Sequence, residues 1–107
     1  MKIEHIRNII RRRKYRLSYH AELERDADQI TISEIEKALC SDQSAIIEDY
    51  PNDPRGSSCL ILGFTSANRP IHIVCGFGDD QLLVIITVYQ PDLDEWIDFK
   101  IRKENNG

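Results

Sequence analysis

Two histidines and one tyrosine are the residues of this 107-residue chain whose types and settings are best suited to chemistry. His20 stands in "LSYHAELERDAD", His72 in "PIHIVCGF", and Tyr89 at the end of "LLVIITVY". An imidazole changes its charge near neutral pH, so together with a tyrosine and nearby cations it forms a usable acid–base set. Proton transfer is therefore the chemistry that these side chains indicate.

Each of the two histidines also has a structural interpretation. His72 can be one half of a half-exposed cross-strand pair. His20 follows Ser18 in the first turn of an expected helix and shares a stripe with Leu23 and Ala27. On that interpretation His20 is a neutral, hydrogen-bonded residue that fastens the helix to a sheet. The residues alone leave both alternatives open, and they favour His72 as the chemical group.

Other common chemistries have no support in the pattern. No two histidines have the i, i+3 or i, i+4 spacing of metal ligands, and there is no HExxH, calcium-loop, phosphate-loop or GxSxG motif. The cysteines are odd in number and lack a CxxC pair, so we expect buried free thiols at Cys40, Cys59 and Cys75. We expect no metal and no cofactor.

The net charge of −4 conceals a strong asymmetry. Seven cations and one acid give residues 1–16 a charge of +6, which leaves −10 on the other 91 residues. A body this acidic argues against extended phosphate binding, so any contact with nucleic acid has to be local. The basic run Arg11–Lys14 also has a structural reason, because cations are favoured at the C-terminal end of a helix.

Three helices are expected before residue 42. Ile3, Ile6 and Ile10 form the apolar stripe of a helix over 2–13. Ser18 is placed to cap a helix over about 19–28. Thr31 and Glu34 have the spacing of a capping box, with Ile30 and Ile35 as its hydrophobic staple. The second and third helices, closely joined, predict a helical hairpin.

Four strands are expected after the helices, over 45–50, 59–65, 71–77 and 82–89. Their connections are short, so neighbouring strands must be antiparallel. We therefore predict a single α+β domain, 1–107, with the helices on one face of a four-stranded antiparallel sheet. Strict alternation then places His72 on the open face of the sheet, and places Tyr89 on the same side of its strand as Leu83 and Ile85.

The segment "PDLDEWIDFKIRKENNG" is ambiguous. Alternation of Ile97, Phe99 and Ile101 with charged residues indicates a strand, whereas the Pro-Asp opening suits a helix start. Trp96 is expected to be a lid on the core. The acids around it, which form a solvated rim or an acid–base carboxylate pair, are Asp92, Asp94, Glu95 and Asp98. The final "ENNG" is expected to be a frayed tail.

No apolar run reaches the roughly 18 residues that a membrane span needs, and the N-terminus lacks the features of a secretory signal. We therefore expect a cytoplasmic protein.

The order "LSYHA", "ITISEIEKAL", "IIEDYP", "CLILGF", "RPIHIVCG" and "IITVYQPDLDEW" resembles the bacterial family of domain of unknown function 4258, over about residues 15–98. The basic helix 2–13 lies outside this region. The resemblance implies a fold similar to the RelE/ParE-type toxins. It also implies the toxin half of a toxin–antitoxin pair, with a small zinc-finger antitoxin as partner and metal-independent RNA cleavage as activity. The motif positions of the family are His20, His72 and Tyr89.

One departure from the family pattern concerns the first of these motifs. Members commonly place arginines four and eight residues after the first histidine, and here those positions hold Glu24 and Asp28. The nearby Arg25 is expected to be a surface ion-pair partner. Carboxylates repel a phosphate, so this departure weakens the nuclease interpretation.

Two functional hypotheses follow. The first is a metal-independent endoribonuclease with His72 or His20 as acid–base and Tyr89 orienting the substrate. Its phosphate-binding residues are Arg11, Arg12, Arg13, Lys14, Arg25, Lys100 and Arg102. The second is a non-catalytic interaction module that binds a small antitoxin-like protein through its basic helix or an open strand edge.

Overall fold

The computed structural model describes residues 1–104 and has the α+β architecture that the sequence predicts. The helices and strands, in chain order, are α1 (Ile3–Arg11), β1 (Tyr15–Leu17), α2 (Tyr19–Ala27), α3 (Ile32–Cys40), β2 (Ala45–Tyr50), β3 (Ser58–Phe64), β4 (Pro70–Phe77), β5 (Leu83–Tyr89), β6 (Trp96–Ile97) and β7 (Ile101–Arg102). Residues 105–107 of the expected tail lie outside the described residues.

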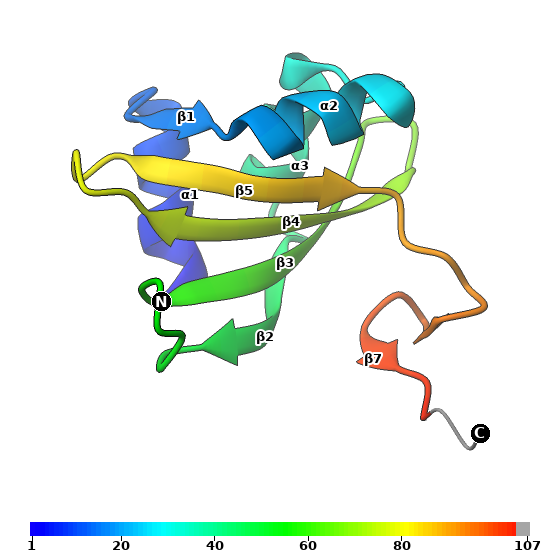
Figure 1. The fold of residues 1–107 in the computed structure, drawn as a ribbon. Helices are drawn as coiled ribbons and strands as arrows, with labels where there is room; N and C mark the ends of the chain where they lie inside the picture. The colour runs from blue at the N-terminus through cyan, green and yellow to red at the C-terminus, as the bar shows by residue number, and fades with distance from the viewer. Residues whose placement is uncertain (105–107) are drawn as a thin grey trace.

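The main sheet has five strands in the order β1-β5-β4-β3-β2 (Figure 1). Strands β2 to β5 form the expected antiparallel meander. The prediction of four strands is wrong, because β1 adds to β5 as a parallel edge strand with Tyr15 opposite Leu83. Three residues carry too little periodicity to indicate a strand, and the partner of β1 lies almost 70 residues further along the chain.

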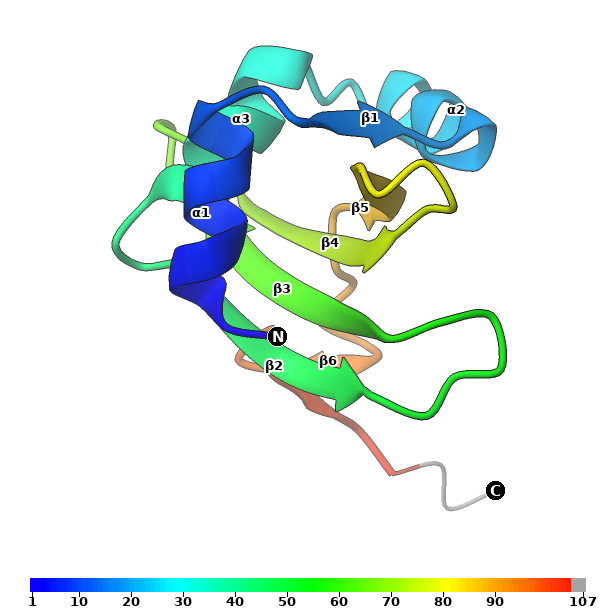
Figure 2. The same cartoon turned by 90° about the vertical axis from the view of Figure 1, so that its left-hand side faces the viewer.

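Helices α1 and α3 cover one face of the sheet (Figure 2). The core between them holds Ile6 and Ile10 of α1, Ile35 and Leu39 of α3, and the inward residues of the strands, including the expected Cys59 and Cys75. Gly63 permits a close approach of α3 to β3, because a Cβ there would lie 2.7 Å from the carbonyl oxygen of Ala38. We call the opposite side of the sheet the outer face.

Both predicted helix starts are confirmed. The Ser18 hydroxyl accepts a hydrogen bond from the Ala21 amide at 3.0 Å. Thr31 and Glu34 form the complete capping box, and Ile30 and Ile35 are buried. The predicted pairing of α2 with α3 is less close than expected, since the main helical neighbour of α3 is α1.

The predicted buried stripe of α2 is wrong. His20 and Leu23 are exposed, as is Ala27, whereas Ala21 is buried and Glu24 and Asp28 are half-buried. The helix lies along the edge of β5 rather than flat on the sheet (Figure 1). Its inward side therefore faces backbone amides instead of apolar side chains, and carboxylates are the suitable residues there.

Three side chains from α2 and its two capping positions form hydrogen bonds with the edge of β5, beyond the point where β1 ends. Glu24 accepts from the Val88 amide at 3.2 Å, and Asp28 accepts from the Gln90 amide at 3.0 Å. The Ser18 hydroxyl donates to the Ile86 carbonyl at 2.8 Å. An edge strand exposes such groups to unwanted pairing, so these side chains take the place of a further strand.

A β-bulge in β5 changes which residues face the core. Val74 pairs with Thr87 and Cys75 with Ile85, which leaves Ile86 as the extra residue. Leu83, Ile85 and Val88 consequently lie in the core. Tyr89 lies opposite His72 and contacts it on the outer face, not on the side of Leu83 and Ile85 that strict alternation predicts.

The ambiguous C-terminal segment forms a small antiparallel hairpin. Ile97 pairs with Ile101 and Trp96 with Arg102, and we call residues 96–102 the C-terminal hairpin. It lies across the sheet from α1 (Figure 2). Trp96 is buried, with only 3% of its surface exposed, but it covers His72 on the outer face rather than the helix-side core.

Within residues 1–104 there is no helix that is both long and apolar enough to cross a membrane.

The carboxylates on the β5 edge generate a stability prediction. Glu24→Ala leaves the Val88 amide without its charged acceptor, so the free energy of unfolding should fall by about 2 kcal/mol. The matched control is Asp26→Ala, an exposed acid of the same helix, which should change it by less than about 0.5 kcal/mol. Urea denaturation measures both variants, and equal losses would contradict the edge-capping role.

Candidate functional site

His72 and Tyr89, the pair that the sequence favours for acid–base chemistry, do come together. The Nδ1 atom of His72 lies 3.2 Å from the Tyr89 hydroxyl, and its Nε2 atom lies 2.6 Å from the carbonyl oxygen of Phe99. A carbonyl only accepts, so Nε2 carries the proton and Nδ1 accepts from the tyrosine. Both ring nitrogens are occupied by groups of the chain itself.

The prediction that His72 lies on an open face of the sheet is wrong. His72 is 0% exposed, because the C-terminal hairpin covers this end of the outer face. The Trp96 ring stands edge-on to the imidazole with 4.4 Å between the centroids. Alternation along the strand identified the correct face but contained no information about what covers it.

A charged cluster fixes the C-terminal hairpin to the sheet. The sequence analysis did not predict this cluster. Arg102 binds the Glu48 carboxylate with two nitrogens, at 2.9 and 3.1 Å, and its guanidinium lies 4.7 Å over the Trp96 ring. The Tyr50 hydroxyl also donates to Glu48. The expected phosphate-binding Arg102 is therefore neutralised by a carboxylate of β2.

Burial and these hydrogen bonds shift the pKa values of the titratable side chains in the cluster. Burial lowers the pKa of His72 below its ordinary 6.5, although the hydrogen bond to Phe99 opposes the shift. Burial likewise raises the pKa of Tyr89. Burial alone would raise the pKa of Glu48, but hydrogen bonds from Arg102 and Tyr50 outweigh it and lower that pKa. At neutral pH the cluster holds a neutral imidazole beside a fixed ion pair.

His20 lies in a different and open setting. Its side chain is 67% exposed, and its Nε2 atom lies 3.2 Å from the Glu24 carboxylate. Because Glu24 is itself fixed by the Val88 amide, it can hold the ring in one orientation. The interpretation of His20 as a residue that fastens the helix to the sheet is therefore wrong, because its hydrogen-bond partner belongs to its own helix, and its other ring nitrogen is exposed to solvent.

The exposed His20 borders a groove in the half of the outer face that the hairpin leaves uncovered. The groove has a volume of about 540 Å³, and we call it the outer groove. Its apolar lining includes Val74, Phe77 and Ile86, and its polar lining includes Tyr50 and Arg55. The Arg55 side chain is 91% exposed, with its Nε atom 3.4 Å from Asp53. A histidine, an arginine and apolar side chains thus border one concavity.

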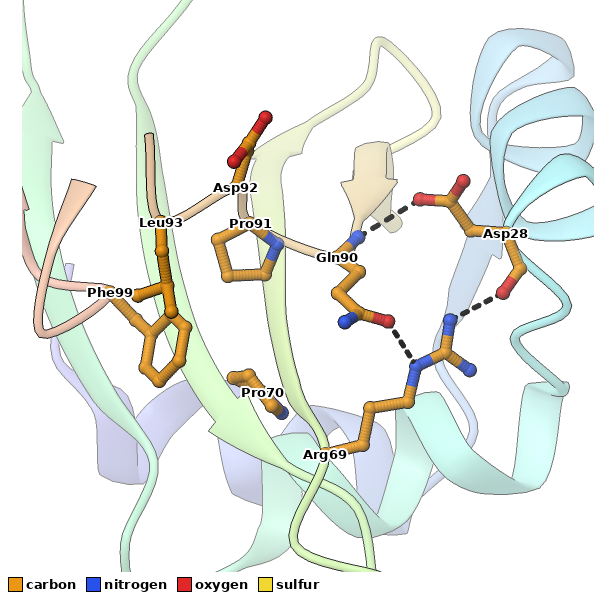
Figure 3. A pocket seen from close by; sticks show the side chains of 8 residues that line it. All are labelled: Asp28, Arg69, Pro70, Gln90, Pro91, Asp92, Leu93 and Phe99. Carbon is orange, nitrogen blue, oxygen red and sulfur yellow. Dashed lines mark hydrogen bonds between the residues drawn. The ribbon is translucent and has the colours of Figure 1, made fainter. Parts of the chain in front are cut away.

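A second concavity, of about 630 Å³, lies where α2 meets the ends of β4 and β5 (Figure 3). Arg69 is the cation among its lining residues. Its guanidinium donates to the Gln90 side chain at 2.7 Å, to the Gln29 carbonyl at 3.1 Å and to the Asp28 carbonyl. Arg69 therefore acts as a clamp between the end of α2 and the sheet, and three of the five N–H donors of its guanidinium are used in this way.

The remaining predicted cations do not gather around either histidine. The run Arg11–Lys14 lies exposed at the end of α1, on the helix-covered side of the sheet. Arg25 pairs with Glu22 at 2.9 Å, as expected of a surface ion pair. Lys100 is exposed in the turn of the C-terminal hairpin. Another cation of the N-terminal arm, Arg7, is buried against Ser44.

Sequence reasoning missed Arg55, Tyr50 and Glu48. Arg55 follows "PNDP" in a connection that reads as turn chemistry alone. Tyr50 and Glu48 stand two residues apart and therefore share a side of β2, which is a signal for a polar pair on one face. Nothing local could pair Glu48 with a residue 54 positions later.

The part of the chain that the structure describes contains no group of three or more histidine, cysteine or acidic side chains arranged to hold a metal ion.

The fold and these side chains define an α+β protein whose sheet carries a covered histidine–tyrosine pair at one end of its outer face and an open groove at the other. The chain belongs to the family described as "Domain of unknown function (DUF4258)", whose model matches residues 17–90. The match leaves out α1 and the C-terminal hairpin. No curated protein and no solved structure matches the chain, so the RelE/ParE-type fold stays a prediction.

The lowered pKa of His72 generates a pH prediction. The unfolded chain binds a proton at this histidine near pH 6.5, before the folded chain does, so acidification through that value should reduce the free energy of unfolding. The contribution of His72 to the free energy of unfolding should be fully present above pH 6.5 and should decrease below it. In His72→Gln this part of the pH dependence should disappear. Denaturation at a series of pH values measures it, and identical slopes in both proteins would contradict the burial of His72.

Proposed function

We propose that the protein is a toxin-type, metal-independent endoribonuclease whose reaction takes place in the outer groove, with His20 as the acid–base group. The observation that carries the proposal is the exposed His20, oriented by Glu24, on the border of a groove that also includes Arg55. Membership in the family supports it through the motif position of His20. The proposal replaces His72 by His20, because His72 has no free ring nitrogen.

The chemistry needs few groups. The imidazole of His20 takes the proton of a ribose 2′-hydroxyl, whose oxygen attacks the neighbouring phosphorus. The bond from phosphorus to the 5′-oxygen breaks, and that oxygen takes a proton from solvent. The products are a 2′,3′-cyclic phosphate and a 5′-hydroxyl. Arg55 neutralises the charge that develops on the phosphate oxygens, and a base can lie against the apolar side chains of Val74 and Ile86.

A cleavage assay in EDTA tests this assignment. Wild-type protein should convert a labelled single-stranded RNA to fragments that end in a cyclic phosphate. His20→Asn should lower the rate by about 10²-fold or more, the usual contribution of an acid–base group. Arg55→Ala should lower it by about 10-fold or more through lost phosphate binding.

The matched control is Lys37→Ala, which removes an exposed cation from α3, outside the groove. It should leave the rate unchanged. In a bacterial host, induction of the wild-type gene should arrest growth, and His20→Asn should relieve the arrest. Good soluble expression with neither RNA cleavage nor arrest would rule the proposal out.

The second candidate function is a non-catalytic interaction module that binds a small, antitoxin-like protein. It is favoured by Glu24 and Asp28, which stand where the family places arginines and accept backbone amides of β5 instead of binding phosphate. A protein without cleavage or toxicity that still forms a stable complex with a small partner would favour this candidate.

A further inference from the structure

The part of the outer face beneath the C-terminal hairpin has the composition of a peptide-binding site. Leu62 lies opposite His72 on β3, and both Leu62 and Leu60 are buried on this face. His72 offers a ring N–H to a backbone carbonyl, and Glu48 offers a carboxylate oriented by Tyr50. We call these residues of β2, β3 and β4 the hairpin seat. An apolar floor, one donor and one fixed carboxylate are sufficient to position a short segment.

The hairpin uses each of these features as a bound peptide would. Trp96 places its ring against the imidazole, at a centroid distance of 4.4 Å. Phe99 presents its carbonyl oxygen to Nε2 of His72 at 2.6 Å. The guanidinium of Arg102 bonds both oxygens of Glu48 and lies over the Trp96 ring. Aromatic rings and arginines are the residues that dominate the energetics of protein interfaces.

Several observations separate the hairpin from the rest of the fold. Its two strands form a sheet of their own rather than extending the five-stranded sheet. It lies beyond residue 90, where the match to the family ends. Its turn holds Asp98 and Phe99 at positive φ, 52° and 62°, a conformation that a bulky residue such as Phe99 seldom adopts. Its main charged anchor, Arg102, has a side chain that is 62% exposed.

We propose that the hairpin seat is a binding site for a polypeptide segment that presents an aromatic ring and an arginine on one face, and that the chain's own C-terminal hairpin occupies this site in cis. The partner segment has the chemistry of residues 96–102 and displaces them. The hairpin seat shares Tyr50 with the outer groove but lies beneath the C-terminal hairpin, and the inference does not depend on the ribonuclease proposal.

The first test uses the full chain with the cis occupant weakened, Trp96→Ala together with Arg102→Ala. The ligand is a fluorescein-labelled synthetic peptide of residues 91–104, followed by anisotropy. The double variant should bind the peptide at least about 10-fold more tightly than the wild-type chain, where a tethered competitor acts at an effective concentration of about millimolar. The Arg102→Ala peptide should lose most of the affinity, and the matched Lys103→Ala peptide should keep it.

The second test needs no change to the protein and remains valid if the double variant does not fold. Trp96 is the only tryptophan of the chain, so its emission reports the hairpin directly. An unlabelled peptide of residues 91–104 with Trp96→Phe, at millimolar concentration, should shift the emission of the wild-type chain to the red. Far-UV circular dichroism should stay unchanged. The peptide with the additional Arg102→Ala change should not cause the shift.

Two results would overturn the inference. One is the absence of a red shift at saturating peptide. The other is equal binding of the Arg102→Ala and Lys103→Ala peptides, since the seat would then not recognise the guanidinium.

Discussion

The burial of His72 on the face of the sheet away from the helices is the constraint on which the rest of the structure depends. A buried imidazole needs partners for both ring nitrogens, because an unsatisfied buried polar group costs about 1–3 kcal/mol. Tyr89 supplies one partner and the Phe99 carbonyl the other. The hydrogen bond from Tyr89 requires the bulge at Ile86, which turns Tyr89 toward His72. The hydrogen bond to the Phe99 carbonyl requires the C-terminal hairpin, which the ion pair of Arg102 with Glu48 fixes in place. The outer face is consequently closed at this end and open at the other.

The edge of β5 imposes a second constraint with consequences for function. Because β1 covers only the first part of β5, the amides beyond it need acceptors, and Glu24 and Asp28 provide them. Arginines at the same positions could not accept from an amide. Carboxylates, which repel phosphate, therefore lie on the inner side of α2, while His20 lies on the exposed side of the same helix. Any phosphate would have to be bound from across the outer groove, where Arg55 lies.

The parts of the fold that the sequence predicts are those set by local chemistry. The capping box at Thr31, the N-cap at Ser18 and the β2 to β5 meander depend on neighbouring residues and are all present. The parallel strand β1, the bulge at Ile86 and the hairpin over His72 depend on partners far along the chain. The apolar spacing of His20, Leu23 and Ala27 was misleading because α2 packs against a strand edge, whose hydrogen-bonding groups favour acids over apolar residues. The same distinction applies to the site residues. Arg55 and Glu48 could not be predicted, because only tertiary contacts bring them to the groove and to the hairpin.

Modification of individual histidines by diethyl pyrocarbonate, located by mass spectrometry, tests the central claim most directly. In the native full-length chain, the account predicts that His20 reacts at the rate of an accessible imidazole while His72 stays unmodified until the chain is unfolded. Modification of His72 as fast as His20 under native conditions would contradict it, because the outer face would then be open along its whole length.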